Sequence, residues 1–341
     1  MIAEVIKKLL QHEHLTVEEC QQAIDAILSE STSELQVAAF MTALRMKGET
    51  ADEILGAARA MRAKVTRIDH NQLALIDNCG TGGDCSGTFN VSTTAAFVLA
   101  GAGLAVGKHG NRSISSRSGS ADVLQALGAR IELAPQQVAD CIDSIGIGFM
   151  FAPLLHPAMK AVAPIRKKLG FRTIFNLLGP LTNPAFATHQ VIGVFDPGYT
   201  EPIAEVAAAL EVRCIYTVHN SSGIDELATT GVNKVSTIID GAVKTFTIDP
   251  KDMGFTYCSM TDLSGGTADE NAGITLSVLG GERGPALDTV ILNAALGLLA
   301  GERVSSLDDG IELARATIES GKASAKLNDF IQYTNELANV A

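Results

Sequence analysis

Residues 73–102 read LALIDNCGTGGDCSGTFNVSTTAAFVLAGA, which is a short apolar run, a glycine-rich loop and an alanine-rich segment. We expect a strand over Leu73–Cys79 and a helix over Thr93–Ala102. A glycine loop between a strand and a helix lets backbone N–H groups approach an anion, and the helix N-terminus adds a favourable dipole. The spacing fits neither the P-loop nor the dinucleotide fingerprint. A plain glycine-rich turn, with Ser92 or Thr93 as helix N-cap, therefore stays as an alternative.

Strands and helices alternate in the same way along much of the remaining chain. Further strands are expected at Leu104–Lys108, Val191–Phe195 and Cys214–His219, and helices at Ser120–Leu127 and Pro202–Leu210. Residues 235–249 have a β pattern with a turn at Gly241-Ala242, and helix returns from Leu287. This alternation predicts an α/β fold with a mainly parallel central sheet flanked by helices.

The first 65 or so residues show only helical spacing. Thr16 is followed three positions later by Glu19, the pattern of a capping box. Ser33 or Ser31 is the candidate N-cap of the next helix, and Thr50 that of a third. We therefore expect a smaller all-helical domain before the α/β part.

Composition excludes several classes of protein. The 341 residues are 46% hydrophobic and 19% charged, which is not the composition of a disordered chain. The longest apolar stretch, Ala95 to Gly107, is too short for a bilayer core of about 30 Å, and charged residues interrupt the apolar N-terminus. We therefore expect no membrane association and no secretory signal. A formal net charge of -12 counts against a nucleic-acid partner.

The six cysteines are scattered, with no C-x-x-C pair, which is typical of a protein of the reducing cytoplasm. Cys79 and Cys85 are close enough in sequence to suggest a metal or redox pair. Nothing nearby supplies the remaining ligands, so packing roles are favoured.

A second candidate anion site is the stretch 108–120, KHGNRSISSRSGS. It follows an expected strand and combines three fixed positive charges with small hydroxyl residues and no acid, as a phosphate site requires. The alternative is a solvated basic loop. Because the positive charge lies at the carboxyl end of a strand in an acidic protein, we favour an anionic ligand.

Two shorter patterns are weaker on their own. Arg166 could bind a planar carboxylate with both guanidinium nitrogens, but Arg166, Lys167 and Lys168 also suit a solvated helix face. The adjacent Asp225 and Glu226 could bind Mg²⁺ together with substrate phosphates, although adjacent acids are common on surface loops.

In chain order these patterns are far more specific than each is alone. The motifs are GTGGD (80–84), NVST (90–93), KHGNR (108–112), SRSGSAD (116–122), FNLLGPLTNP (175–184) and Asp225-Glu226. Together they resemble the tryptophan-pathway branch of the nucleoside phosphorylase-like phosphoribosyltransferases. The resemblance implies a pentosyltransferase, which moves the phosphoribosyl group of 5-phosphoribosyl 1-diphosphate to the amine of anthranilate and releases diphosphate.

The same resemblance implies a division of the chain and an assembly. Residues 1–68 would form the helical domain, joined by a returning segment at about 168–184, while 69–167 and 185–341 would form the α/β domain. It further implies a homodimer through the helical domain and Mg²⁺ as cofactor, two ions per subunit. Cys79 and Cys85 depart from the family pattern, because an aliphatic residue and a glycine are expected there.

The site residues follow by position from the resemblance. The 5-phosphoribosyl 1-diphosphate site would comprise Gly80, Gly83, Asp84, Thr88, Asn90, Val91, Ser92, Thr93, Lys108, His109, Gly110, Asn111, Arg112, Ser113, Ile114, Ser115, Ser116 and Ser120. Anthranilate would contact Gly80, Asn111 and Arg166, and the metal would be held by Ser92, Asp225 and Glu226. Lys108 and Arg112 would stabilise the leaving charge, and no general base is assigned. A pyrimidine nucleoside phosphorylase and a noncatalytic nucleic-acid binder are the alternatives.

Overall fold

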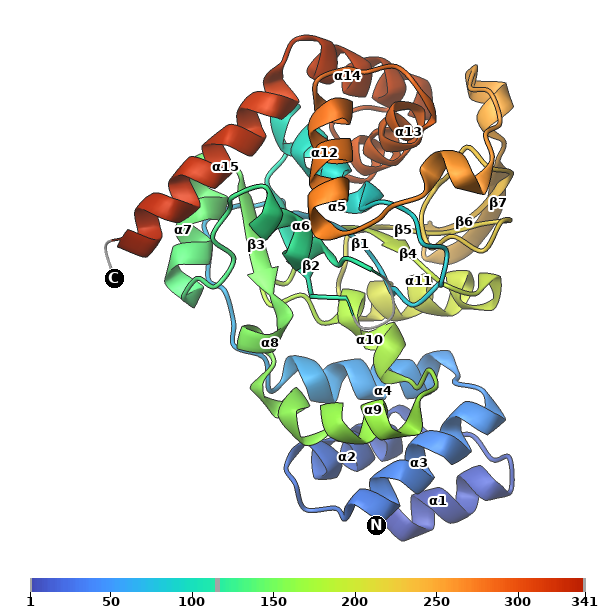
Figure 1. Ribbon diagram of the computed structural model, residues 1–341. Helices are drawn as coiled ribbons and strands as arrows, with labels where there is room; N and C mark the ends of the chain where they lie inside the picture. The colour runs from blue at the N-terminus through green and yellow to red at the C-terminus, as the bar shows by residue number, and fades with distance from the viewer. Residues whose placement is uncertain (1, 114–116, 340–341) are drawn as a thin grey trace.

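The computed structural model describes residues 2–113 and 117–339. Figure 1 shows a layer of helices, which includes the N-terminus, packed against the end of a larger sheet-and-helix body. The N-terminal helices are α1 (Ile2–Leu10), α2 (Val17–Leu28), α3 (Glu34–Lys47) and α4 (Ala51–Arg62). None of the helices within the two described ranges is both long and apolar enough to span a membrane.

Side-chain caps fix the starts of three of these helices. Thr16, Ser33 and Thr50 each accept a hydrogen bond from the backbone N–H three residues on, and the residue there bonds back to complete a capping box. The expected caps at Thr16 and Thr50 are confirmed, and Ser33 rather than Ser31 caps α3.

Seven strands form one sheet in the order β3-β2-β1-β4-β5-β6-β7. They are β1 (Ile76–Gly80), β2 (Val106–Gly110), β3 (Ile147–Phe151), β4 (His189–Gly193), β5 (Cys214–Asn220), β6 (Asn233–Ile239) and β7 (Ala242–Ile248). The first five in this order pair in parallel and the last two antiparallel, which confirms the mainly parallel sheet. The hairpin turn lies at Asp240 and Gly241, one residue earlier than expected, since both have a positive φ.

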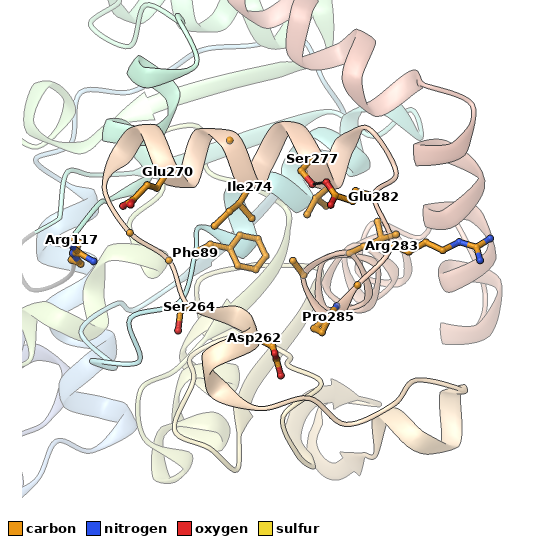
Figure 2. Close-up of a pocket in the computed structure, with 17 residues that line it drawn as sticks. Phe89, Arg117, Asp262, Ser264, Glu270, Ile274, Ser277, Glu282, Arg283 and Pro285 are labelled. Carbon is orange, nitrogen blue, oxygen red and sulfur yellow. Dashed lines mark hydrogen bonds between the residues drawn. The ribbon is translucent and has the colours of Figure 1, made fainter.

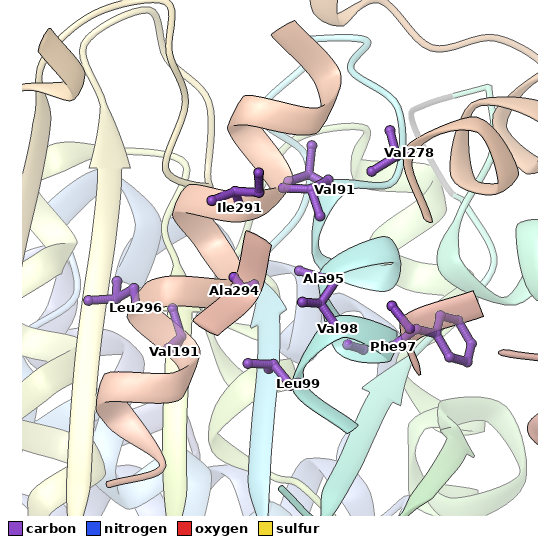
Figure 3. Close-up of a cluster of buried hydrophobic side chains, with 14 of the residues drawn as sticks. Val91, Ala95, Phe97, Val98, Leu99, Val191, Val278, Ile291, Ala294 and Leu296 are labelled. Carbon is purple, nitrogen blue, oxygen red and sulfur yellow. The ribbon is translucent and has the colours of Figure 1, made fainter. Parts of the chain in front are cut away.

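Helices cover both faces of the sheet. The remaining ones are α5 (Val91–Gly101), α6 (Ser120–Ala126), α7 (Pro135–Ile145), α8 (Ala152–Leu155), α9 (Ala163–Leu169), α10 (Phe175–Leu181), α11 (Thr200–Ala209), α12 (Ala268–Leu279), α13 (Pro285–Ala300), α14 (Leu307–Glu319) and α15 (Lys322–Asn339). Figure 3 shows the core of one face, where Ala95 and Leu99 of α5 lie near Ala294 of α13 and Val191 of β4. On the other face, α7 and α11 pack against the strands. Most of α5 therefore belongs to the core, and only its N-terminus is available to a ligand.

A later part of the chain returns to the N-terminal helices. β3 leads directly into α8, a short 3-10 helix (Pro157–Ala161), α9 and α10. Val162, Ile165 and Phe175 share a buried core with Phe40 and Leu44 of α3. The helical layer that faces the carboxyl ends of β1 and β2 is thus built from two separated stretches of sequence (Figure 1).

Candidate active site

The glycine loop and the acidic pair meet at the carboxyl edge of the sheet. Gly80 ends β1 and Gly193 ends the neighbouring β4, in register with each other. A Cβ at Gly193 would overlap the Asp225 carbonyl oxygen, and one at Gly80 would overlap the Asp225 carboxylate. Both positions therefore require glycine for the acidic pair to lie against the strand ends. Gly193 was not among the residues singled out from the sequence.

The loop after β1 has an unusual backbone. Gly82 and Gly83 have φ of 68° and 71°, and Cys85 has φ of 61°. A side chain is strained in this left-handed region, so Cys85 occupies a conformation that suits the glycine expected there. The helix that follows begins at Val91 with Asn90 as N-cap, and Asn90 makes no side-chain capping bond. The alternative that Ser92 or Thr93 caps this helix is wrong, because both lie inside its first turn.

Backbone N–H groups hold the two acidic side chains. Asp225 Oδ2 accepts a hydrogen bond from the Gly82 N–H at 2.7 Å, and Glu226 Oε1 accepts one from the Ser92 N–H at 3.0 Å. The Asp225 N–H in turn donates to Asp84 Oδ2 at 3.3 Å. Three acidic residues are thus gathered where the glycine loop meets the start of α5.

This gathering raises the proton affinity of the site. Burial and the charges of Asp84 and Glu226 raise the pKa of Asp225 well above its usual range. Burial raises the pKa of Glu226 to about 7. Its Oε2 atom is buried and has no hydrogen-bond partner in residues 2–113 and 117–339. An orphaned carboxylate oxygen beside a second acid is relieved by a cation, so these residues fit Mg²⁺.

The protein does not enclose such an ion by itself. Among the described residues, no three histidine, cysteine or acidic side chains converge closely enough to hold a metal. Mg²⁺ commonly takes one or two carboxylates and fills its other positions with phosphate oxygens and water. The arrangement therefore suits a metal that binds together with a phosphorylated ligand.

Lys108 lies buried in β2 directly beside this site. Its Nζ donates to the Asn78 carbonyl oxygen at 2.7 Å. Burial lowers the pKa of Lys108, and the charges of Asp77 and Glu226 oppose that shift. Asp77 is itself fully buried and accepts hydrogen bonds from the His109 N–H and from Asn183 Nδ2. The ammonium group is therefore held at the strand ends with little freedom to move.

Arg112 has carboxylate partners that the sequence did not suggest. Its Nη1 lies 2.9 Å from Asp122 Oδ1 and its Nη2 lies 3.8 Å from Glu132 Oε1. Asp122 also accepts from the backbone N–H groups of Ser113 and Gly119. Asp122, which lies just after the basic stretch 108–120, thus binds that stretch at Ser113 and at Gly119, on either side of residues 114–116. Ile114, Ser115 and Ser116 lie outside the described residues.

The other residues proposed to contact the ligand differ in burial and in the bonds that they already make within the protein. Val91 and Thr93 are 1% exposed, so only their backbone atoms could meet a ligand. Thr88 forms an antiparallel bridge with Ser264. The Asn111 N–H donates to Ser120 Oγ at 3.2 Å, which ties the end of β2 to the start of α6.

Arg166 differs from the two lysines that follow it. Lys167 and Lys168 are exposed, and Lys168 pairs with Glu34 at 3.0 Å, as expected of a solvated helix face. Arg166 is partly buried over the Phe175 ring, 5.9 Å from its centroid. Within the described parts of the chain it has no ion pair or hydrogen bond through its guanidinium. A desolvated, unpaired guanidinium is a ready partner for a carboxylate.

A buried histidine pair joins β2 to the returning helical segment. His109 Nδ1 donates to the Gly179 carbonyl oxygen at 3.0 Å, so its Nε2 accepts from His156 Nε2 at 3.1 Å. Burial lowers the pKa of His109 to about 3 and that of His156 to about 4. Both imidazoles are therefore neutral near pH 7, which argues against proton transfer by His109.

Acid should therefore destabilise the protein through this pair. The folded-state pKa values of both histidines lie below the usual value of about 6.5, so the unfolded chain takes up protons first as the pH falls. The free energy of unfolding is therefore not reduced by these groups above a pH of about 6.5. It decreases as the pH falls toward 4, by up to about 1.4 kcal/mol per pH unit for each histidine. His156→Gln keeps the donor without the titration, so its melting temperature should fall less steeply between pH 6.5 and 5. His12→Asn, at an exposed histidine, is the control. An unchanged slope in His156→Gln would contradict this.

A cavity of about 630 Å³ lies beside the site rather than at its centre. It is lined by Phe89 of the glycine loop, by Arg117 and by residues of α12 and of the segments on either side of it. In Figure 2, Phe89 and Ile274 face each other inside it, while Arg117 and Arg283 lie at opposite ends. Lys108, Arg166 and the acidic pair do not line it.

Comparison with known proteins shows that both parts of the chain match domains of one enzyme family. Residues 3–65 match the glycosyl transferase family helical bundle domain, and residues 72–324 match the a/b domain of the same family. The helical layer and the mixed sheet with its glycine-rich loop thus define a glycosyl transferase of this type.

Individual relatives show to which family of glycosyl transferases the chain belongs. A protein of Moorella thermoacetica named anthranilate phosphoribosyltransferase is 50% identical over 298 residues, 87% of this chain and 88% of the relative. The crystal structure of anthranilate phosphoribosyltransferase from Thermus thermophilus superimposes with a TM-score of 0.92 at 41% identity, covering 97% of this chain and 99% of the other. The chain belongs to the anthranilate phosphoribosyltransferase family.

A more distant relative has been solved with ligands. The anthranilate phosphoribosyltransferase of Saccharomyces cerevisiae, in complex with PRPP (5-phosphoribosyl 1-diphosphate) and Mg, has a TM-score of 0.89 at 30% identity, covering 98% of both chains. The same yeast enzyme has been solved in complex with 4-fluoroanthranilate.

Proposed function

We propose that this chain transfers the 5-phosphoribosyl group of 5-phosphoribosyl 1-diphosphate to the amine of anthranilate, as a step of tryptophan biosynthesis. The observation that carries the proposal is the convergence of Asp225 and Glu226 on the glycine loop, with Glu226 Oε2 left unpaired among the described residues. Family membership and the yeast complexes with PRPP, Mg and 4-fluoroanthranilate support the choice of substrates.

In the proposed reaction the bond from ribose C1 to the diphosphate oxygen breaks, and diphosphate leaves with the electron pair. A bond forms between C1 and the anthranilate nitrogen, which loses one proton to solvent. Aromatic amines are neutral near pH 7, so the lone pair is available without a general base. The protein's task is to position the two substrates and to stabilise the charge that grows on diphosphate.

The chain's own groups supply that stabilisation. Lys108, fixed at the strand ends by Asn78, places a positive charge beside the proposed diphosphate site. Arg112 is bound to Asp122, so its contribution requires that it exchange this carboxylate for the diphosphate. Mg²⁺, when bound by Asp225, Glu226 and the Ser92 hydroxyl, would neutralise further charge on the leaving group. Two ions per subunit are proposed, with diphosphate oxygens and water filling most positions around each, since no three acidic side chains among the described residues converge on one ion.

The second substrate is proposed to lie between the α/β part and the returning helical segment. Arg166, which has no carboxylate partner within the described residues, would hold the anthranilate carboxylate. Asn111 and the backbone at Gly80 would complete the contacts. Closing the site between these two parts would exclude water from the reacting carbon.

Release of one diphosphate for each anthranilate consumed, measured with a coupled pyrophosphatase, tests this assignment. The phosphorylase alternative predicts instead that the protein cleaves uridine or thymidine with inorganic phosphate. Nucleoside cleavage without diphosphate release would overturn the proposal.

We further propose that the chain is a homodimer through its helical layer and that it acts in the cytoplasm. Leu10 of α1 and Leu35 and Met46 of α3 are 68%, 83% and 79% exposed, on helices that pack together. Large exposed apolar side chains on two neighbouring helices suit a partner surface. All six cysteines are free, which suits a reducing compartment. The homodimer predicts a mass in sedimentation equilibrium of twice that of the chain.

A further inference from the structure

A segment far away in sequence runs along the glycine loop. The Phe89 N–H donates to the Leu263 carbonyl oxygen at 3.0 Å, and the Gly265 N–H donates to the Gly87 carbonyl oxygen at 2.8 Å. Residues 263–271, which we call the flanking segment, lead from this pairing into the first turn of α12. A Cβ at Gly265 would lie 2.7 Å from the Thr88 carbonyl oxygen, so the close pairing depends on glycine.

Asn271 connects the flanking segment to the loop. It is 1% exposed, and its Nδ2 donates to Asn90 Oδ1 at 2.8 Å although the two residues are 181 positions apart. Its Oδ1 accepts from the Gly266 N–H at 2.7 Å. Asn90 Nδ2 donates onward to the Ser118 carbonyl oxygen at 3.3 Å. One chain of hydrogen bonds thus joins the flanking segment to both loops of the proposed diphosphate site.

Both polar groups of the Asn90 side chain are therefore engaged within the protein. The backbone carbonyl oxygen of Asn90 accepts from the Thr94 N–H at 3.0 Å, so Asn90 is joined directly to the first turn of α5. That turn presents the Ser92 N–H, which holds Glu226. Phe89 lines the cavity with one side of its ring (Figure 2), although Phe89 and Val91 are both buried in the core. Core packing therefore holds the apolar side chains of this part of the loop, and the hydrogen bonds of Asn90 fix its polar groups.

We propose that Asn271 is a positioning residue for the reaction. It touches no substrate; it holds Asn90, and through Asn90 the loop at Ser118, in the arrangement that binds the diphosphate. This inference rests on the proposed function for the identity of the substrate.

The test compares Asn271→Leu and Asn271→Asp with Thr275→Val in the full chain. Leu removes both bonds of Asn271, whereas Asp keeps the acceptor for Gly266 and loses only the donor to Asn90, so a rise in KM in both variants points to the donor. Thr275 is a matched control, because it is fully buried on the same helix and its Oγ1 bonds to Thr94 of α5 at 3.0 Å. We expect the KM for 5-phosphoribosyl 1-diphosphate to rise about tenfold in the Asn271 variants, as for one lost buried hydrogen bond. The KM for anthranilate should stay within about twofold, and Thr275→Val should match the wild type.

Two further measurements separate positioning from general damage. In an Asn90→Ala background, Asn271→Leu should add little, since its effect passes through Asn90. Hydrogen exchange of the substrate-free protein should be faster at residues 87–93 in Asn271→Leu than in Thr275→Val. Equal rises in both KM values, or full additivity with Asn90→Ala, would overturn the inference. Wild-type protein that binds no 5-phosphoribosyl 1-diphosphate would overturn the proposed function, and the exchange rates would still decide whether Asn271 fixes the loop.

Discussion

Replacing Asp225 by Asn and Glu226 by Gln in one variant is expected to lower kcat/KM by about 10³-fold or more, with the fold intact. The two carboxylates are the groups that the structure leaves ready for a cation, and electrostatic stabilisation of a leaving group is commonly worth about 10²–10³-fold for each contribution. Steady-state rates at saturating Mg²⁺ measure the effect. The adjacent exposed acids Asp308 and Asp309 at the start of α14, changed to Asn, give a control with the same change in net charge.

The same variant separates a functional role from a structural one. Because burial raises the pKa of Glu226 to about 7, its ionised form destabilises the folded protein, and stability falls as pH rises from about 4.5 toward 7. Neutral side chains of the same shape remove this penalty. The melting temperature of the metal-free variant at pH 8 should therefore equal or exceed that of the wild type. Activity within tenfold of the wild type would contradict the assignment of the acidic pair.

Arg166→Ala is expected to raise the KM for anthranilate about 10²-fold, with the KM for 5-phosphoribosyl 1-diphosphate within about twofold. The guanidinium is partly buried and has no carboxylate partner within the described residues, so a charge-assisted pair of hydrogen bonds is available to the substrate. Arg166→Lys should recover only part of the loss, since an ammonium cannot bind both carboxylate oxygens in the same plane. Initial rates over a range of anthranilate concentrations measure both effects.

Lys167→Ala is the matched control for this variant. Lys167 is the next residue of α9 and is exposed, so its removal changes the local charge equally without touching the proposed contact. An unchanged anthranilate KM in Arg166→Ala, or an equal rise in Lys167→Ala, would show that Arg166 does not bind the carboxylate.

Features set by neighbours in sequence were predicted from the sequence well. The caps at Thr16 and Thr50 depend on a residue three positions away, and the strand–loop–helix order around Gly80 depends on local composition. β3 was missed, because Ile147–Phe151 is a short apolar run that periodicity alone does not distinguish from helix. α12 was missed as well: its sequence contains Gly273 and shows no clear apolar stripe.

The site was predictable as a set of segments but not as a set of contacts. Asp122 pairs with Arg112, and the requirement for glycine at position 193 arises only because the Asp225 backbone passes over it. The bond between Asn271 and Asn90 joins positions 181 residues apart. Such pairings are fixed by the packing of α12 and the strand ends, which no local pattern encodes. The difference in burial between Arg166, which is partly buried, and the exposed Lys167 and Lys168 was likewise apparent only from the structure.

The most direct test follows anthranilate fluorescence after the purified protein is mixed with 5-phosphoribosyl 1-diphosphate and Mg²⁺. We expect a loss of fluorescence that requires all three components, stops on chelation of the metal and resumes when Mg²⁺ is restored. Folded wild-type protein that consumes no anthranilate under these conditions would contradict the proposed function.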